Sequence, residues 1–85
     1  MKVYKPTPEQ ISATDSWGTW SKEPSIFPWT YDEKETCYIL AGEAIVKDDV
    51  GNEIRFTAGD MVEFSAGLSC EWNIVETIRK KYLFG

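Results

Sequence analysis

Short segments of β-forming residues recur at close intervals along the second half of this chain, separated by turns that contain glycine. The turns are Asp48–Asn52, Ala58-Gly59-Asp60 and Ser65-Ala66-Gly67. The strands expected between and after them are Ile54–Phe56, Met61–Phe64, Leu68–Val75 and Ile78–Phe84. Many short strands at such spacing are typical of β-barrels and β-sandwiches, so the sequence predicts an all-β fold.

A longer strand is predicted to precede these segments, over residues 35–47. In it Glu35, Cys37 and Ile39 would point to one face, and the residues between them to the other. Because residues 38–40 form an apolar run, both faces of this strand are expected to be covered.

One short helix is predicted near the start of the chain, over residues 7–11. Thr7 suits the N-cap, Pro8 the first helical position, and Gln10 the position that completes a capping box. Everything after this helix is expected to be strand and turn.

A chain of 85 residues is expected to form one domain, residues 1–85. A domain of this size buries only about 60–65% of the surface of its unfolded chain. Four Trp, four Tyr and four Phe offset the small core because each buries a large area. Oligomerisation is another way to bury surface, and a homodimer is the expected assembly.

The net charge of −5 disfavours nucleic acid or an acidic membrane as a partner, since both require a basic surface. The basic run Arg79-Lys80-Lys81 is interpreted as a solvated strand edge. No apolar stretch approaches the ~20 residues of a membrane span, and the first residues lack the apolar core of a signal peptide. A cytoplasmic location with reduced cysteines is therefore expected.

Several stretches resemble the motifs of cupins: Glu35-Thr36-Cys37-Tyr38-Ile39-Leu40-Ala41-Gly42, Ala58-Gly59-Asp60-Met61-Val62, Ser65-Ala66-Gly67-Leu68-Ser69-Cys70-Glu71-Trp72, and the closing Arg79-Lys80-Lys81-Tyr82. From about Phe27 to Phe84 the chain resembles a small single-domain, RmlC-like cupin. It is most similar to the short, histidine-poor cupins grouped with the ureidoglycine aminohydrolase-type cupin domain. The resemblance implies a cupin double-stranded β-helix, or jelly-roll barrel.

The chain contains no histidine, although most metal-dependent cupins hold their ion with three histidines and a glutamate. Aligned on Glu35, the first cupin motif places Trp29 and Tyr31 at two histidine positions, and the second places Cys70 at the third. Tryptophan cannot ligate a metal, so no metal and no cofactor are expected. The best remaining donor set is Glu35 with Cys70 and Cys37.

Six residues are predicted to line a ligand pocket in the barrel: Trp29, Tyr31, Glu35, Cys37, Cys70 and Trp72. Each also has a simpler interpretation. Glu35 is either a strand-end carboxylate satisfied by hydrogen bonds or a pocket acid, and it is the one candidate catalytic residue. Both cysteines are either small buried apolar side chains or a thiol-based site. The aromatic residues either fill the barrel or line a pocket, whereas Trp17 and Trp20 are expected to make core or dimer contacts.

The leading interpretation is a metal-free cupin that binds a small organic molecule in its barrel, with Glu35 as the polar anchor. One alternative is a divergent aminohydrolase or isomerase of the ureidoglycine type, in which Glu35 performs acid–base chemistry or holds a metal with Cys70 and Cys37. Another is a structural or regulatory homodimer whose own side chains fill the barrel. The first interpretation, which involves no catalysis, is preferred.

Overall fold

The computed structural model describes the whole chain, residues 1–85, and confirms the all-β prediction. Seven strands and one short helix follow one another in this order: β1 (Lys2–Tyr4), α1 (Pro8–Ala13), β2 (Gly18–Lys22), β3 (Ser25–Thr30), β4 (Glu35–Asp48), β5 (Glu53–Thr57), β6 (Met61–Phe64) and β7 (Ser69–Phe84). A single 3₁₀ turn, Thr14–Ser16, connects α1 to the strand that follows it.

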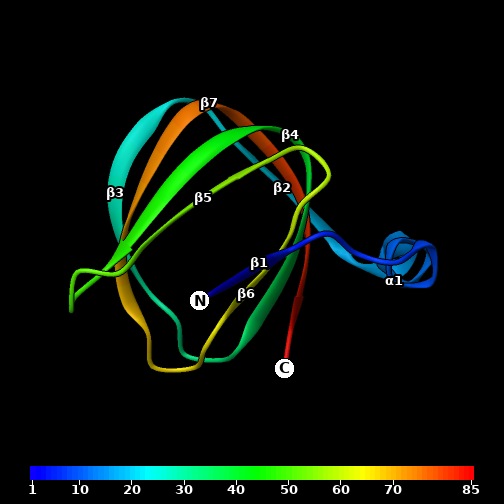
Figure 1. Cartoon of the computed structure of the whole chain (residues 1–85), viewed down its shortest axis with the longest axis horizontal. Helices are drawn as coiled ribbons and strands as arrows, with labels where there is room; N and C mark the ends of the chain where they lie inside the picture. The colour runs from blue at the N-terminus through cyan, green and yellow to red at the C-terminus, as the bar shows by residue number, and fades with distance from the viewer.

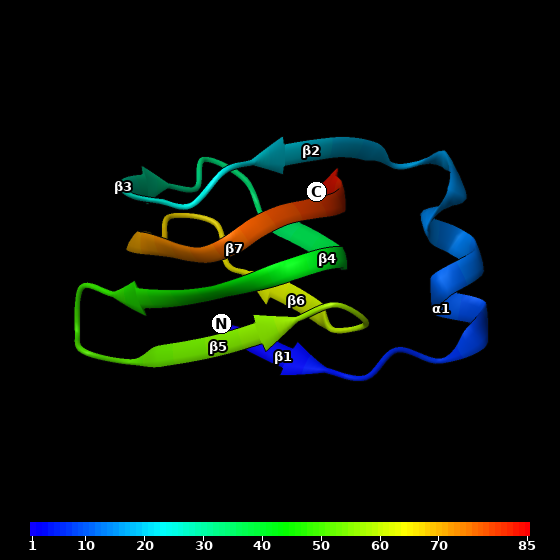
Figure 2. The same ribbon diagram turned by 90° about the horizontal axis from the view of Figure 1, so that it is seen from above.

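The two long strands, β4 and β7, form the centre of the fold and pair with each other along most of their length. Every pairing in the sheet is antiparallel, and the strand order is β1-β6-β4-β7-β2. At the other end of the long strands, β5 pairs with β4 and β3 pairs with β7. Each long strand therefore has one set of partners at its start and another at its end. The sheet curls into a barrel, seen end-on as a ring in Figure 1 and from above in Figure 2.

The curl of the sheet coincides with irregular pairing in the middle of β4. The register between β4 and β7 shifts at three points between Ile39 and Ala44. Gly42 lies within this stretch with a φ of 94°. A Cβ atom at this position would be 2.1 Å from the backbone oxygen of Thr77, so only glycine fits there without rearrangement.

The helix begins as the sequence predicts and lies beside the barrel, outside the ring of strands (Figures 1 and 2). The Thr7 side chain accepts a hydrogen bond from the backbone N–H of Gln10. The Gln10 side chain in turn accepts one from the backbone N–H of Thr7. This reciprocal pair is the predicted capping box. No helix in the chain is long and apolar enough to cross a membrane.

Two strand predictions differ from the structure. The segments predicted as Leu68–Val75 and Ile78–Phe84 are one continuous strand, β7. The residues between them, Glu76 and Thr77, include neither glycine nor proline, and β7 continues through them with shifts in its register against β4. The strands β1, β2 and β3 were not predicted individually, because their pairing with β6 and β7 is a tertiary contact.

The core fills much of the barrel and is strongly aromatic. Its twelve buried members are Tyr31, Cys37, Ile39, Ala44, Val46, Phe56, Val62, Phe64, Cys70, Trp72, Ile74 and Ile78. Phe64 stacks on Tyr31 with ring centroids 4.8 Å apart and packs against Trp72 at 5.6 Å. Of these large rings, Tyr31 and Trp72 also line the cavity in which the candidate site lies.

Candidate functional site

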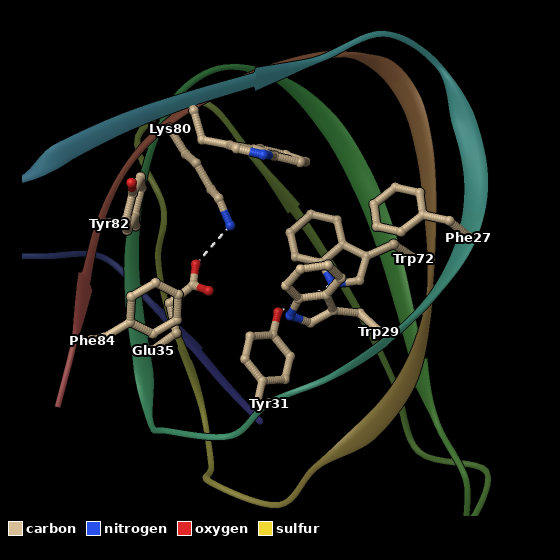
Figure 3. Close-up of a pocket in the computed structure, with 9 residues that line it drawn as sticks. Phe27, Trp29, Tyr31, Glu35, Trp72, Lys80, Tyr82 and Phe84 are labelled. Atoms are coloured by element: carbon tan, nitrogen blue, oxygen red, sulfur yellow. Dashed lines mark hydrogen bonds and ion pairs between the residues drawn. The ribbon is translucent and has the colours of Figure 1, made fainter.

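A cavity of about 220 Å³ opens into the barrel beside this aromatic core (Figure 3). Seven of its nine lining residues are hydrophobic. The nine are Trp20, Phe27, Trp29, Tyr31, Glu35, Trp72, Lys80, Tyr82 and Phe84. Mostly aromatic walls with a few polar groups are the usual composition of a small-molecule site.

The alternation of β-strands places these side chains in the cavity. On β3 and just after it, Phe27, Trp29 and Tyr31 are every second residue, and on β7 the lining residues 72, 80, 82 and 84 are all even-numbered. Successive side chains of a strand point to opposite faces of the sheet, so residues of one parity share the inner face. Trp29 and Phe84 remain about half exposed, at 50% and 45%.

Glu35 on β4 and Lys80 on β7 form a buried ion pair in this cavity. The Lys80 Nζ atom lies 2.6 Å from Glu35 Oε2, and the side chains are only 7% and 4% exposed. The ammonium group also lies over the ring of Trp20, at 4.7 Å, and that of Trp72, at 4.9 Å. Removing two charges from water is costly, and here close pairing together with two aromatic faces offsets that cost.

The two oxygens of the Glu35 carboxylate differ in their surroundings. Oε2 accepts hydrogen bonds from both Lys80 Nζ and the Cys37 thiol, whereas Oε1 has no partner within the protein. Every fully buried side-chain nitrogen and oxygen in the structure has a partner, so Oε1 must be accessible. Since Glu35 lines the cavity, Oε1 is available to accept a hydrogen bond there.

Tyr31 supplies a hydroxyl group to the cavity from another wall (Figure 3). Its oxygen accepts a hydrogen bond from Trp72 Nε1 at 3.1 Å, and its own O–H has no acceptor within the protein. Burial, and then the nearby Glu35 carboxylate, raise the pKa of Tyr31 far above its ordinary value. The hydroxyl therefore stays protonated and can donate a hydrogen bond.

Of the six residues predicted to line the pocket, four meet around the cavity: Trp29, Tyr31, Glu35 and Trp72. Cys37 lies behind Glu35, is fully buried, and contacts its carboxylate without lining the cavity. Burial is the largest cause of a strong rise in the pKa of its thiol, which therefore stays protonated and is a poor nucleophile at neutral pH.

The structure separates Cys70 from the other donor atoms. Its thiol donates to the backbone oxygen of Trp29 and does not line the cavity. Glu35, Cys37 and Cys70 therefore do not assemble into the donor set considered from the sequence. No group of three or more His, Cys, Asp or Glu side chains in the chain is arranged to hold a metal ion.

The interpretation of the basic run as a solvated strand edge is wrong for Lys80, which is only 6% exposed and lies at the centre of the site. The sequence carried a usable signal, because Lys80 alternates with Ile78, Tyr82 and Phe84 and so belongs to the apolar face of its strand. Trp20 was expected to make only core or dimer contacts, and it lines the cavity and packs against Trp72. The remaining lining residues that the sequence analysis did not propose are Phe27, Tyr82 and Phe84.

The curled antiparallel sheet, with an aromatic cavity inside it, defines a small cupin. The family model of the EutQ-like cupin domain matches residues 9–82, so the chain belongs to that family. This confirms the predicted resemblance to a small cupin and the predicted fold. A search of curated proteins found no match.

The fold of this chain is similar to that of several solved structures. The chain is 42% identical to a DUF861-family protein of Thermotoga maritima, with a TM-score of 0.95, over 99% of this chain and 98% of that one. A putative ethanolamine utilization protein Q of Salmonella typhimurium is 26% identical, with a TM-score of 0.72, over 96% of this chain and 66% of that one. The Clostridium difficile EutQ protein is 19% identical, with a TM-score of 0.72, over 79% of this chain and 52% of that one.

Proposed function

We propose that this cupin binds a small organic molecule in its barrel cavity. The observation that carries the proposal is the Glu35–Lys80 ion pair, which is buried in aromatic walls yet keeps hydrogen-bonding capacity directed into an accessible space. The free Glu35 oxygen and the Tyr31 hydroxyl proton have no partner within the protein, so each can take a hydrogen-bonding partner from a molecule in the cavity. A bound molecule with matching polar groups would supply that partner.

The size of the cavity sets the size of the ligand. An apolar protein cavity of about 150 Å³ can bind benzene. The cavity of about 220 Å³ therefore has room for one six-membered ring with a small substituent.

The proposal is tested by binding a panel of monocyclic compounds to the intact protein, including neutral, anionic and cationic members. Three of the four Trp residues line the cavity, so binding is expected to change the intrinsic fluorescence or the indole NMR signals. Trp29→Ala is expected to weaken binding, because this half-exposed ring lines the cavity. Val50→Ala is a matched control, since Val50 is 78% exposed in the β4–β5 turn and does not line the cavity. A panel in which no compound binds at millimolar concentration would contradict the proposal.

The other interpretations lead to different measurements. An enzyme that uses Glu35 for proton transfer would lose turnover in Glu35→Gln while still binding its ligand. A barrel filled by its own side chains would show no binding at all, and the accessible cavity disfavours that alternative. The predicted homodimer, cytoplasmic location and absence of a cofactor remain predictions. Sedimentation equilibrium tests the homodimer directly.

A further inference from the structure

We infer that the preferred ligand is a neutral monocyclic phenol, whose hydroxyl binds at the Glu35–Lys80 pair while its ring packs on the aromatic walls. This inference rests on the proposed function and adds the chemical class of the ligand. It follows from the charge of the cavity, the arrangement of its donors and acceptor, and the nature of its walls.

The charge of the cavity favours a neutral ligand. Glu35 and Lys80 are the only charged residues among the nine that line it, and their charges cancel. A carboxylate ligand would gain from Lys80 but would face the free Glu35 oxygen, and an ammonium ligand would meet the opposite conflict. Transfer of either ion from water into aromatic walls would then be poorly compensated.

The polar atoms of the cavity suit a hydroxyl group. Lys80 Nζ and Glu35 Oε2 are only 2.6 Å apart, so a donor and an acceptor are presented at nearly the same place. A hydroxyl group combines one donor and two acceptor sites on a single oxygen atom. Its oxygen can accept from the Lys80 ammonium while its proton is donated to the free Glu35 oxygen. The Tyr31 hydroxyl, which has an unused proton, can serve the second acceptor site.

The walls of the cavity suit an aromatic ring. Trp29 and Phe84 are half exposed, and Phe27 and Trp72 form a stacked pair with ring planes 11° apart. Aromatic rings pack favourably on one another in stacked and edge-to-face geometries. A phenol has the size derived above, and it stays neutral at pH 7 because phenolic groups titrate near pH 10.

The inference is tested by calorimetric titration of the intact protein with five compounds of similar size: phenol, anisole, toluene, benzoate and benzylammonium. Phenol is expected to bind about tenfold or more tightly than anisole and toluene, because those two cannot donate to Glu35 and leave a buried acceptor unpaired. In Glu35→Gln this preference is expected to shrink to a fewfold. Val50→Ala is expected to leave all affinities unchanged.

The possible results separate the inference from the proposed function. Equal affinities for phenol and toluene, or tighter binding of benzoate or benzylammonium, would overturn the phenol assignment while supporting a ligand cavity. A lack of binding by all five compounds, and by the wider panel, would overturn both. The comparison of phenol with anisole uses only the natural protein, so the test holds even where a variant fails to fold.

Discussion

Removal of Lys80 from the Glu35–Lys80 pair is expected to destabilise the protein more than removal of both charges. Both side chains are more than nine-tenths buried, so a single substitution leaves an uncompensated charge inside the barrel. Losses of this kind typically cost about 3–5 kcal/mol. A chain of 85 residues has a total stability of about 4–13 kcal/mol at ordinary values per residue, so the effect should be large.

The structure also predicts which single variant suffers more. In Lys80→Met the carboxylate keeps only the Cys37 thiol as a donor, and the full cost of about 3–5 kcal/mol is expected. In Glu35→Gln the ammonium group keeps the faces of Trp20 and Trp72 and gains an amide oxygen as acceptor. The expected cost there is smaller, about 1–3 kcal/mol.

A double-mutant cycle measured by urea unfolding at pH 7, followed by tryptophan fluorescence, provides the test. Introducing Glu35→Gln into Lys80→Met is expected to stabilise that variant by about 2 kcal/mol, because it removes the unpaired charge. The reasoning is refuted if Lys80→Met costs less than about 1 kcal/mol and the second substitution does not help. The pair would then behave as a solvated surface salt bridge.

Three further predictions concern other parts of the molecule. Gly42→Ala should cost about 2–4 kcal/mol in urea unfolding, because its Cβ would overlap a backbone oxygen of β7. Gly51→Ala, at a similar φ of 91° but with open space around it, should cost only about 1 kcal/mol. The hydrogen bond from Tyr4 is the largest cause of a lowered pKa of Glu63. The ionised Glu63 carboxylate therefore contributes its full stabilisation above its ordinary pKa of 4.5, and this contribution is lost as the pH falls through the lowered pKa. Tyr4→Phe should accordingly make the free energy of unfolding less dependent on pH in the acid range, as measured by urea unfolding at several pH values. The buried Cys37 thiol, with its raised pKa, should react with iodoacetamide at pH 8 only after unfolding; rapid labelling of the native protein would show that it is accessible.

Local sequence signals predicted the fold well where short-range chemistry decides the structure. The Thr7–Gln10 capping box forms because its hydrogen bonds join residues three apart. The predicted strand Met61–Phe64 matches β6, because turns bound it on both sides. The continuity of β7 could not be predicted in this way, because it depends on pairing with the distant strand β4, against which the register shifts around Glu76 and Thr77.

The candidate site was predicted in part. The alignment on cupin motifs selected Trp29, Tyr31 and Glu35, which the structure gathers around one cavity. It also selected Cys70, whose thiol instead contacts a backbone oxygen of β3. Lys80 was set aside, because a lysine in a basic run is normally solvated and its interior position depends on a carboxylate 45 residues away.

The sequence by itself determined the alternation that assigns each side chain to one face of its strand, the glycine turns that separate the strands, and the cap that begins the helix. These features depend on backbone geometry and hydrogen bonds over a few residues, so they can be predicted from short segments of sequence. Only the tertiary structure decided that Glu35 and Lys80 are partners, that their pair faces an aromatic cavity, and that Cys37 lies behind it. Those relations follow from which strands pair and in what register, and pairing between distant segments is set by the packing of the whole barrel.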